Sequence, residues 1–281
     1  MSDHVIVFDL ETTPDLEAVS RIHGFQGHCE AEAREALGDK FPKLPLHKIM
    51  CIGALVAERI HGVWRVEAIG APHIGERSEP ELIISFAEKI AAHRPQLVTF
   101  NGTSFDLPVL RYRAMMHRIS APGLDCRPYF RRYAEDCVDL CDVLSSFDSR
   151  SKMSLNDLSR TLGFPGKPGA MDGSQVEKYV HNGRIAEVAA YCEIDVVNTY
   201  RIWLVYELFR GTLSHQQYHR SELDLEEFIC ARLASKPHWS HLARDTSGLK
   251  PVVLDQETAA RTGEQMAEIA RLLRDAEIHN E

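Results

Sequence analysis

The sequence has no long hydrophobic run, no leader-like start and no excess of positive charge. None of its 281 residues lie in a stretch near the roughly 18 consecutive apolar residues of a membrane helix. The first residues, MSDHVIVFD, contain neither a basic region nor a cleavable apolar segment, so we expect no secretion signal. We therefore expect a globular protein with no membrane partner.

Paired cysteine motifs are also missing. The seven cysteines are odd in number and form no C-x-x-C motif, and Cys137 and Cys141 have no matching second pair. This pattern favours reduced, mostly buried thiols in a cytoplasmic protein over a disulfide framework or a zinc site. The histidines are scattered, which is typical of surface or core side chains rather than metal ligands.

The net charge of -9 argues against a protein that coats nucleic acid through bulk positive charge. It does not exclude an enzyme that binds a nucleic-acid strand locally, because the charged residues are unevenly distributed along the sequence. Between Leu107 and Tyr133 there is one acid, Asp125, and six arginines: Arg111, Arg113, Arg118, Arg127, Arg131 and Arg132. Two interpretations stay open for these arginines, a solvated face and a surface that contacts phosphates.

The hydrophobic pattern predicts an α/β fold. We expect strands at 4–10, 48–57, 63–69, 96–100 and 136–140, and helices at 78–90, 106–117, 154–164 and 185–209. Two short helical pieces are expected within 15–37, and the segment 163–173, with four glycines and two prolines, is expected to be a loop. This order of elements indicates a mixed sheet, with an antiparallel side and a parallel side, flanked by helices.

The C-terminal part of the chain, residues 210–281, has a helical pattern. In its last segment, apolar residues at helical spacing form a stripe: Ala259, Ala260, Met266, Ile269, Ala270 and Leu273. Such a stripe indicates core packing or a helix that binds a partner. We expect residues 1–209 to form the main domain and residues 210–281 to be a helical extension packed on it.

Carboxylates stand at the end of the first predicted strand, VIVFDLETTPD. Side chains alternate along a strand, so Asp9 and Glu11 point to the same side. Two such carboxylates repel each other, and each has a raised pKa unless a positive charge lies between them. A divalent cation such as Mg²⁺ is the simplest such charge, although the pair alone is also compatible with a structural role.

Two further segments strengthen the metal interpretation. In VTFNGTSFDLPVL, an apolar strand ends in polar residues and is followed by Asp106, which could also serve as a helix N-cap. In AAYCEIDVVNTY, Tyr191 and Asp195 are four residues apart on a helix, so both face one side. An acid in so apolar a helix is costly unless it is paired or bound to metal.

These three segments resemble the three motifs of the DEDD superfamily of 3′–5′ exonucleases, which have a DnaQ-like, ribonuclease-H-like fold. Asp9 with Glu11 is similar to the first motif, Asn101-x-x-x-Phe105-Asp106 to the second, and Tyr191-x-x-x-Asp195 to the third. The tyrosine is typical of the DEDDy branch. FDLET, FNGTSFDLPVL, DLCDVLS and the Gly-Lys-Pro loop at Lys167 are especially similar to the proofreading exonuclease domains of family B DNA polymerases. The resemblance covers about residues 4–209, without a polymerase part.

The resemblance implies a ribonuclease-H-like sheet and two Mg²⁺ or Mn²⁺ ions held by Asp9, Glu11, Asp106 and Asp195. Asp9 would bridge the two ions, and Glu11 with Asp195 would complete the ion that activates the attacking water. Asp106 would hold the second ion, beside the leaving 3′-oxygen. Tyr191 would orient the water, since a phenol with a pKa near 10 is a poor base at neutral pH. The expected products are nucleoside 5′-monophosphates.

A second group of residues is expected to bind the substrate. Phe105 would stack on terminal bases or pack in the core, and Asn101 would contact the terminal nucleotide. The backbone at Leu10 and Thr12 would meet the terminal sugar, and Lys167 would reach a phosphate or remain solvated.

The sequence thus predicts a metal-dependent 3′–5′ exonuclease that acts on single-stranded DNA. The same chemistry on RNA ends is the close alternative, because nothing in the sequence separates the two sugars. A catalytically silent nucleic-acid-binding or scaffold protein is the alternative from a different class. It is disfavoured because a scaffold has no need of five matched polar positions. Protein partners and oligomeric state are not indicated.

Overall fold

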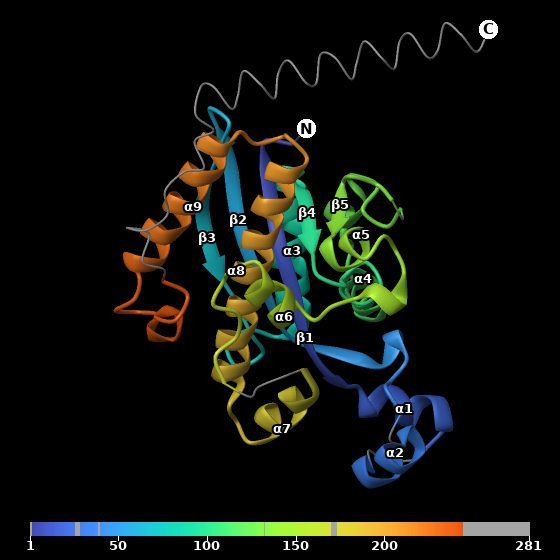
Figure 1. Cartoon of the computed structure of the whole chain (residues 1–281). Coiled ribbons are helices and arrows are strands. Elements are labelled where there is room, and N and C mark those ends of the chain that lie inside the picture. The colour runs from blue at the N-terminus through green and yellow to red at the C-terminus, as the bar shows by residue number, and fades with distance from the viewer. Residues whose placement is uncertain (1, 26–28, 39, 132, 170–172, 244–281) are drawn as a thin grey trace, which may run out of the picture. The chain divides into compact units, whose positions relative to one another are not determined.

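A mixed five-stranded sheet forms the centre of the molecule (Figure 1). The computed structural model describes residues 2–25, 29–38, 40–131, 133–169 and 173–243. The spatial order of the strands is β3-β2-β1-β4-β5. Their bounds are β1 His4–Pro14, β2 His47–Ile60, β3 Val63–Gly70, β4 Gln96–Thr99 and β5 Cys137–Asp139.

The pairing of these strands has the two sides that the element order predicted. β2 pairs antiparallel with β1 and β3, whereas β4 pairs parallel with β1 and β5. A two-residue turn joins β2 to β3, whereas α1 and α2 lie between β1 and β2; each parallel pair is joined by a crossover that contains a helix. The α/β class and the ribonuclease-H-like mixed sheet are therefore confirmed.

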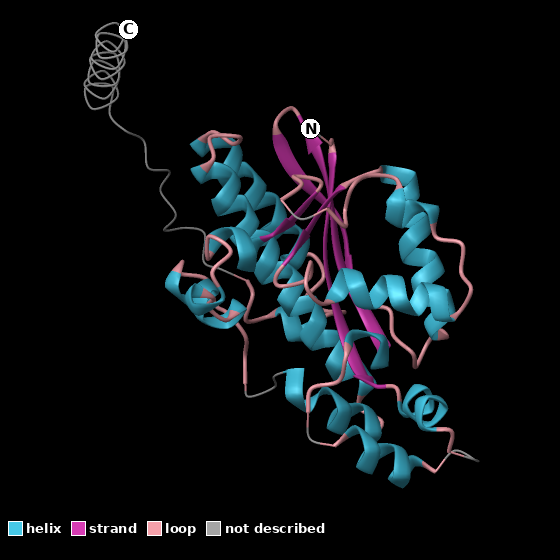
Figure 2. Cartoon of the chain, turned by 90° about the vertical axis from the view of Figure 1, so that its right-hand side faces the viewer, coloured by secondary structure: helices cyan, strands magenta, loops and turns pink. Residues whose placement is uncertain are grey.

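Helices cover both faces of the sheet, which Figure 2 shows nearly edge on. On one face, α8 packs on β1 and β2, while α9 packs on β3. On the other face lie α3 and α4, whose apolar residues pack with Ile6 and Phe8 of β1. The helix bounds are α1 Leu16–His23, α2 Glu30–Leu37, α3 Glu79–His93, α4 Asp106–Met116, α5 Leu140–Leu144, α6 Leu155–Thr161, α7 Val176–His181, α8 Ile185–Phe209 and α9 His215–Cys230.

β1 alternates as the sequence pattern predicted. Val5 and Val7 belong to the core under α8, whereas Ile6, Phe8 and Leu10 belong to the core under α3 and α4. Since the alternation has a period of two, Asp9 and Glu11 continue the face of Val5 and Val7, toward α8. The strand is buried on both faces, so its backbone is held rigidly and fixes the positions of the Asp9 and Glu11 side chains.

The described part of the C-terminal segment packs on β3 through α9 and on α8 through a short 3₁₀ turn, Pro237–Trp239. Glu193 of α8 anchors this turn because its carboxylate accepts hydrogen bonds from Lys236 (2.7 Å) and from the indole N–H of Trp239 (3.0 Å), and lies 2.6 Å from His238. The predicted stripe at 259–273 lies outside the described residues.

The cysteines are free, as expected from their spacing. Four of the seven are buried, namely Cys51, Cys137, Cys141 and Cys192. Within the described part of the chain, no helix is both long and apolar enough to cross a membrane.

Candidate active site

One cavity of about 730 Å³ opens beside the end of β1 that carries the acids. Apart from the six arginines, it contains every residue for which the sequence suggested a catalytic, metal-binding or substrate-binding role. They come from β1, the start of α4, the loop before α7 and one side of α8, segments far apart in the chain. The ten residues are Asp9, Leu10, Glu11, Thr12, Asn101, Phe105, Asp106, Lys167, Tyr191 and Asp195.

Asp9 and Glu11 lie where β1 meets α8. Asp9 is opposite Gly53 of β2, and the β1–β2 register shifts immediately after Glu11. A side chain at position 53 would collide with the helix, because a Cβ there would lie 2.5 Å from the Sγ atom of Cys192. Glycine at this position therefore allows α8 to approach the strand behind Asp9.

Asp106 is the first residue of α4, but its side chain is not the N-cap. Instead, its Oδ1 accepts a hydrogen bond from the backbone N–H of Leu10 at 2.9 Å, which ties α4 to β1 between Asp9 and Glu11. A Cβ on Gly102 would lie 2.8 Å from the Oδ2 of Asp106. The carboxylate is thus held between a strand amide and a glycine that must remain small.

Tyr191 and Asp195 face the cavity from α8, as their four-residue spacing predicted. Lys167 joins them, since its ammonium donates to Tyr191 Oη at 2.5 Å and to Asp195 Oδ2 at 2.6 Å. It also lies 4.3 Å from the centroid of the Tyr191 ring. The lysine is therefore a fixed part of the acid cluster rather than a solvated side chain.

Two asparagines that the sequence analysis did not single out hold the Lys167 loop. Asn156 accepts a hydrogen bond from the Lys167 N–H at 2.9 Å, and the buried Asn198 donates to the Gly166 carbonyl at 3.2 Å. Gly166 has φ +70°, which favours glycine. Asn198 lies three residues after Asp195 in an apolar helix, and this placement was the signal that could have identified it.

The four carboxyl groups all have raised pKa values. Burial, offset by the Lys167 charge, raises the pKa of Asp9 to about 6 and that of Asp195 to about 7. Burial, together with the charge of Asp9, holds the pKa of Glu11 and of Asp106 well above the usual range. One ammonium therefore does not compensate four crowded carboxylates.

The donor set fits divalent metal ions. It offers several carboxylate oxygens in one cavity, which hard cations such as Mg²⁺ and Mn²⁺ prefer. Ligand atoms of Asp9, Glu11 and Cys192 lie within 4.8 Å of one another. Oδ1 of Asp195 is buried and has no hydrogen-bond partner among the described residues. Buried acceptors are almost always satisfied, so this oxygen is suited to a cation.

Cys192 is a neighbour of the acids that sequence reasoning did not identify. Its Sγ lies 3.3 Å from Asp9 Oδ2 and donates to it. Burial raises the pKa of the Cys192 thiol well above its usual range, so the sulfur remains protonated and can act as this donor. Its position next to Tyr191 on α8 was visible in the sequence, but a lone cysteine carried no chemical signal.

The aromatic wall of the cavity is larger than expected. Phe105 packs edge-on against His47 at 4.8 Å between ring centroids, and both contact Phe41, which is 75% exposed. Thr12 hydroxyl and His47 Nδ1 lie 3.0 Å apart. Neither Phe41 nor His47 could be assigned from the sequence, because each reaches the cavity through the fold of the segment before β2.

The six arginines do not form one continuous surface. Arg113 is buried in a salt bridge with Asp15 and Glu79, Arg127 pairs with Asp136, and Arg118 bonds a backbone carbonyl. Arg111 and Arg131 remain exposed, and Arg132 lies outside the described residues. The interpretation that all six arginines contact phosphates is therefore wrong for at least Arg113, because the carboxylates of Asp15 and Glu79 bind its guanidinium in the interior.

Sheet and acidic cavity together have the arrangement of a nuclease with a ribonuclease-H-like fold. A family model described as "Predicted 3'-5' exonuclease related to the exonuclease domain of PolB" matches residues 39–245. The chain belongs to this family and is therefore an enzyme that hydrolyses phosphodiesters, of a kind that generally uses divalent metal ions. The match includes Asp106, Tyr191 and Asp195 but begins after Asp9 and Glu11.

Among solved structures, the chain is similar to a family B DNA polymerase from the hyperthermophilic archaeon Pyrobaculum calidifontis. The TM-score is 0.49 and the sequence identity is 14%, over 84% of this chain. The similarity covers 30% of the polymerase chain. No curated protein matches this chain in sequence.

Proposed function

We propose that the chain is a 3′–5′ exonuclease that removes nucleoside 5′-monophosphates from single-stranded DNA ends with two Mg²⁺ or Mn²⁺ ions. The observation that carries the proposal is the convergence of four carboxylates, Tyr191 and Lys167 on one cavity. DNA is proposed because the family is described by its relation to a DNA polymerase exonuclease domain. The RNA alternative is tested below.

Asp9, Glu11, Asp106 and Asp195 would hold the ions. When bound, such ions activate water at neutral pH and stabilise the attacking and leaving oxygens of a phosphodiester. The four acids would hold the ions in fixed positions, because β1, α4 and α8 fix the backbone of each acid and the Leu10 amide fixes the Asp106 carboxylate.

Tyr191 acts as a hydrogen-bond donor rather than a base. Burial and the neighbouring acids raise the pKa of its hydroxyl above the usual value of 10, so the phenol stays protonated. Lys167 donates to the phenol oxygen, so the hydroxyl proton must point to another acceptor. Asp195, whose pKa is raised by burial and partly lowered by a hydrogen bond with Tyr191, is one such acceptor, and the attacking water or a phosphate oxygen would be another once the substrate is bound.

The burial of the acids favours an unpaired strand end. Glu11, Asp106 and Asp195 are 6%, 4% and 6% exposed, so a phosphodiester must enter the cavity to reach them. Phe41 and Phe105 form an aromatic wall on which a terminal base can stack, and stacking tolerates any base. Asn101, whose Oδ1 accepts a bond from Lys152, keeps its amide N–H groups for the terminal nucleotide.

The test uses 5′-labelled single strands with Mg²⁺ or Mn²⁺. Wild type should produce a ladder that shortens from the 3′ end and release 5′-monophosphates, with DNA degraded faster than a matched RNA. Asp9→Ala should abolish the ladder, whereas Asp125→Ala, which removes an exposed carboxylate outside the cavity, should not. If wild type and Asp9→Ala are equally inert while both bind the strand, the chain is a binding protein and the proposal fails.

We also propose a cytoplasmic location, which the state of the thiols supports. Cys51 and Cys192 are free and buried beside the acids. A reducing compartment such as the cytoplasm keeps thiols free, which agrees with this proposal.

A further inference from the structure

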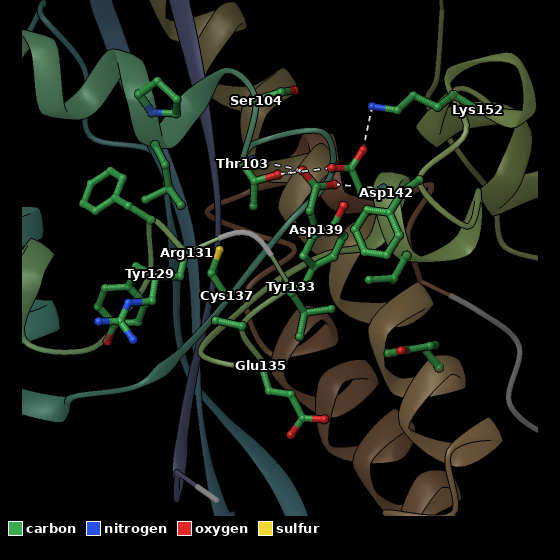
Figure 3. Close-up of a pocket in the computed structure, with 18 of the residues that line it drawn as sticks. Thr103, Ser104, Tyr129, Arg131, Tyr133, Glu135, Cys137, Asp139, Asp142 and Lys152 are labelled. Carbon is green, nitrogen blue, oxygen red and sulfur yellow. Dashed lines mark hydrogen bonds and ion pairs between the residues drawn. The ribbon is translucent and has the colours of Figure 1, made fainter.

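A second cavity, of about 650 Å³, lies next to the candidate active site (Figure 3). Its walls come from α4, the segment between α4 and β5, the start of α5 and the C-terminal end of α8. Ser104 lines both cavities. Lys152 of the second cavity also donates to Asn101 of the first, at 3.0 Å. The two cavities are therefore neighbours along the same surface.

The acids of the second cavity are already satisfied. Asp142 pairs with Lys152 at 2.7 Å, and Glu135 pairs with Arg210 at 2.7 Å. Asp139 accepts from the backbone N–H groups of Asn101 and Thr103, at 2.7 and 2.9 Å. Figure 3 shows the chain of bonds through Thr103, Asp139, Asp142 and Lys152 along one wall. Each acid therefore has a cation or hydrogen-bond donors beside it, and the four cations that line the cavity (Arg111, Arg131, Lys152 and Arg210) outnumber its three acids.

Two cations of this cavity remain available. Arg111 and Arg131 are exposed, and neither forms a salt bridge within the described ranges of the chain. Arg111 lies over the ring of Phe130, with its guanidinium carbon 4.6 Å from the ring centroid, a cation–π contact that favours this position of the side chain. A guanidinium in such a contact still presents several N–H donors to a phosphate.

Two aromatic residues of the cavity are exposed. Tyr133 is 69% exposed and Phe147 is 36% exposed, and their rings meet edge-on with centroids 4.6 Å apart. Only two other aromatic (Phe, Tyr or Trp) side chains, Phe41 and Phe209, are exposed among the described residues, so exposure sets this pair apart from the aromatic residues of the core. Aromatic faces next to arginines are the combination by which proteins bind unpaired bases.

The backbone of this pair is also unusual. Tyr133 has φ 68° and Phe147 has φ 60°, in the left-handed region that bulky residues rarely adopt. Strained backbone of this kind persists where the surrounding structure enforces it, and it is concentrated at functional sites. Glycine or asparagine would adopt the same backbone more easily, so aromatic residues here reduce stability without gaining burial.

From these observations we propose that the second cavity binds a nucleotide of the same strand, upstream of the 3′ end. Tyr133 and Phe147 stack on its base, and Arg111 and Arg131 contact its phosphates. The proposal rests on the proposed function in one respect, namely that the 3′ end occupies the first cavity. It also assigns the substrate a preferred length: a dinucleotide is expected to occupy the first cavity alone, and a longer strand to reach the second as well.

The first experiment measures binding without turnover. Fluorescein-labelled (dT)₁₂ is titrated with the full chain in EDTA, by fluorescence anisotropy. Tyr133→Asn and Arg111→Ala should each weaken binding about tenfold, in line with the contribution of one stacked base. Tyr133→Phe should bind like wild type. The matched control is Arg232→Ala, since Arg232 also lies over a phenylalanine ring, 3.5 Å from the Phe228 centroid, but outside both cavities.

The second experiment measures turnover with Mn²⁺. Tyr133→Asn should raise KM for (dT)₁₂ about tenfold and leave kcat and the hydrolysis of (dT)₂ unchanged. Its melting temperature should be unchanged or higher, because asparagine tolerates left-handed backbone. A structural role for Tyr133 would instead lower the melting temperature.

The proposal is overturned if Tyr133→Asn and Arg111→Ala bind (dT)₁₂ like wild type, or if they impair (dT)₂ and (dT)₁₂ equally. Unchanged strand binding would leave the aromatic pair as a surface for a protein partner. These outcomes differ from failure of the proposed function, in which wild type cleaves neither strand yet its binding in EDTA still depends on Tyr133.

Discussion

Replacing Gly102 with alanine tests whether the position of the Asp106 carboxylate limits catalysis. A Cβ at position 102 would lie 2.8 Å from Oδ2 of Asp106 and 2.6 Å from Cβ of Thr99. Ordinary contacts begin at 3.4 Å, so the carboxylate must move by 3.4 minus 2.8, about 0.6 Å, unless the backbone moves instead. Its other oxygen is held by the Leu10 N–H, so the shift also loosens that hydrogen bond.

The expected result is a large loss of activity with a smaller loss of stability. Displacements of about 1 Å in a catalytic group can cost about 100-fold in rate, so we expect kcat to fall about 10- to 100-fold. Overpacking costs about 1 to 3 kcal/mol of unfolding free energy. The assay is steady-state hydrolysis of labelled single-stranded DNA, combined with the Mn²⁺-dependent rise in melting temperature, which should require more Mn²⁺ in the variant.

Gly70→Ala is the matched control. Gly70 ends β3, and a Cβ there would meet nothing within 4 Å. This variant should keep the activity and the Mn²⁺ response of wild type. If Gly102→Ala also keeps wild-type kcat and Mn²⁺ response, the reasoning that places Asp106 in the metal site is refuted.

Three further predictions concern charge. Lys167→Met should raise the pKa of Asp195 above about 7 and move the rising limb of the kcat pH profile to higher pH; an unshifted profile would exclude this role. In EDTA, lowering the pH from 8 to 5 should raise the melting temperature by about 3 °C or more. The reason is that Asp9 and Asp195 bind more protons in the folded than in the unfolded chain over this range. Asp195→Asn should therefore weaken the rise. Arg113→Met should cost about 3 to 5 kcal/mol of unfolding free energy in urea, because it leaves buried carboxylates unpaired, and a loss below about 1 kcal/mol would contradict the buried salt bridge.

Local patterns in the sequence predicted the strand and the helix that carry most of the candidate site. The apolar run before Asp9 predicted a buried strand, and its two-residue alternation placed Asp9 and Glu11 on one face. The spacing of Tyr191 and Asp195 likewise placed both on one side of α8. These relations depend only on the geometry of one strand or one helix, so a sequence is sufficient to find them.

The sequence was less informative about contacts between elements. The sequence suggested an N-cap role for Asp106, but it could not show that the Leu10 amide binds this carboxylate. It left Lys167 as solvated or phosphate-bound, and it could not show that Tyr191 and Asp195 bind the ammonium group. Arg113 was counted among surface arginines, although it lies in the interior with Asp15 and Glu79. Each of these partners is more than 20 residues away in the chain.

By itself, then, the sequence determined the order of elements, the faces of β1 and α8, and four of the five acids that line the cavity, the fifth being Glu177. Only the tertiary structure decided which neighbours tune those acids: Cys192 beside Asp9, Gly102 beside Asp106, and the asparagines that hold the Lys167 loop. It alone also revealed the second cavity, whose residues come from four separate segments. The physical reason is that pKa values and packing depend on distances between distant segments, which no local pattern contains.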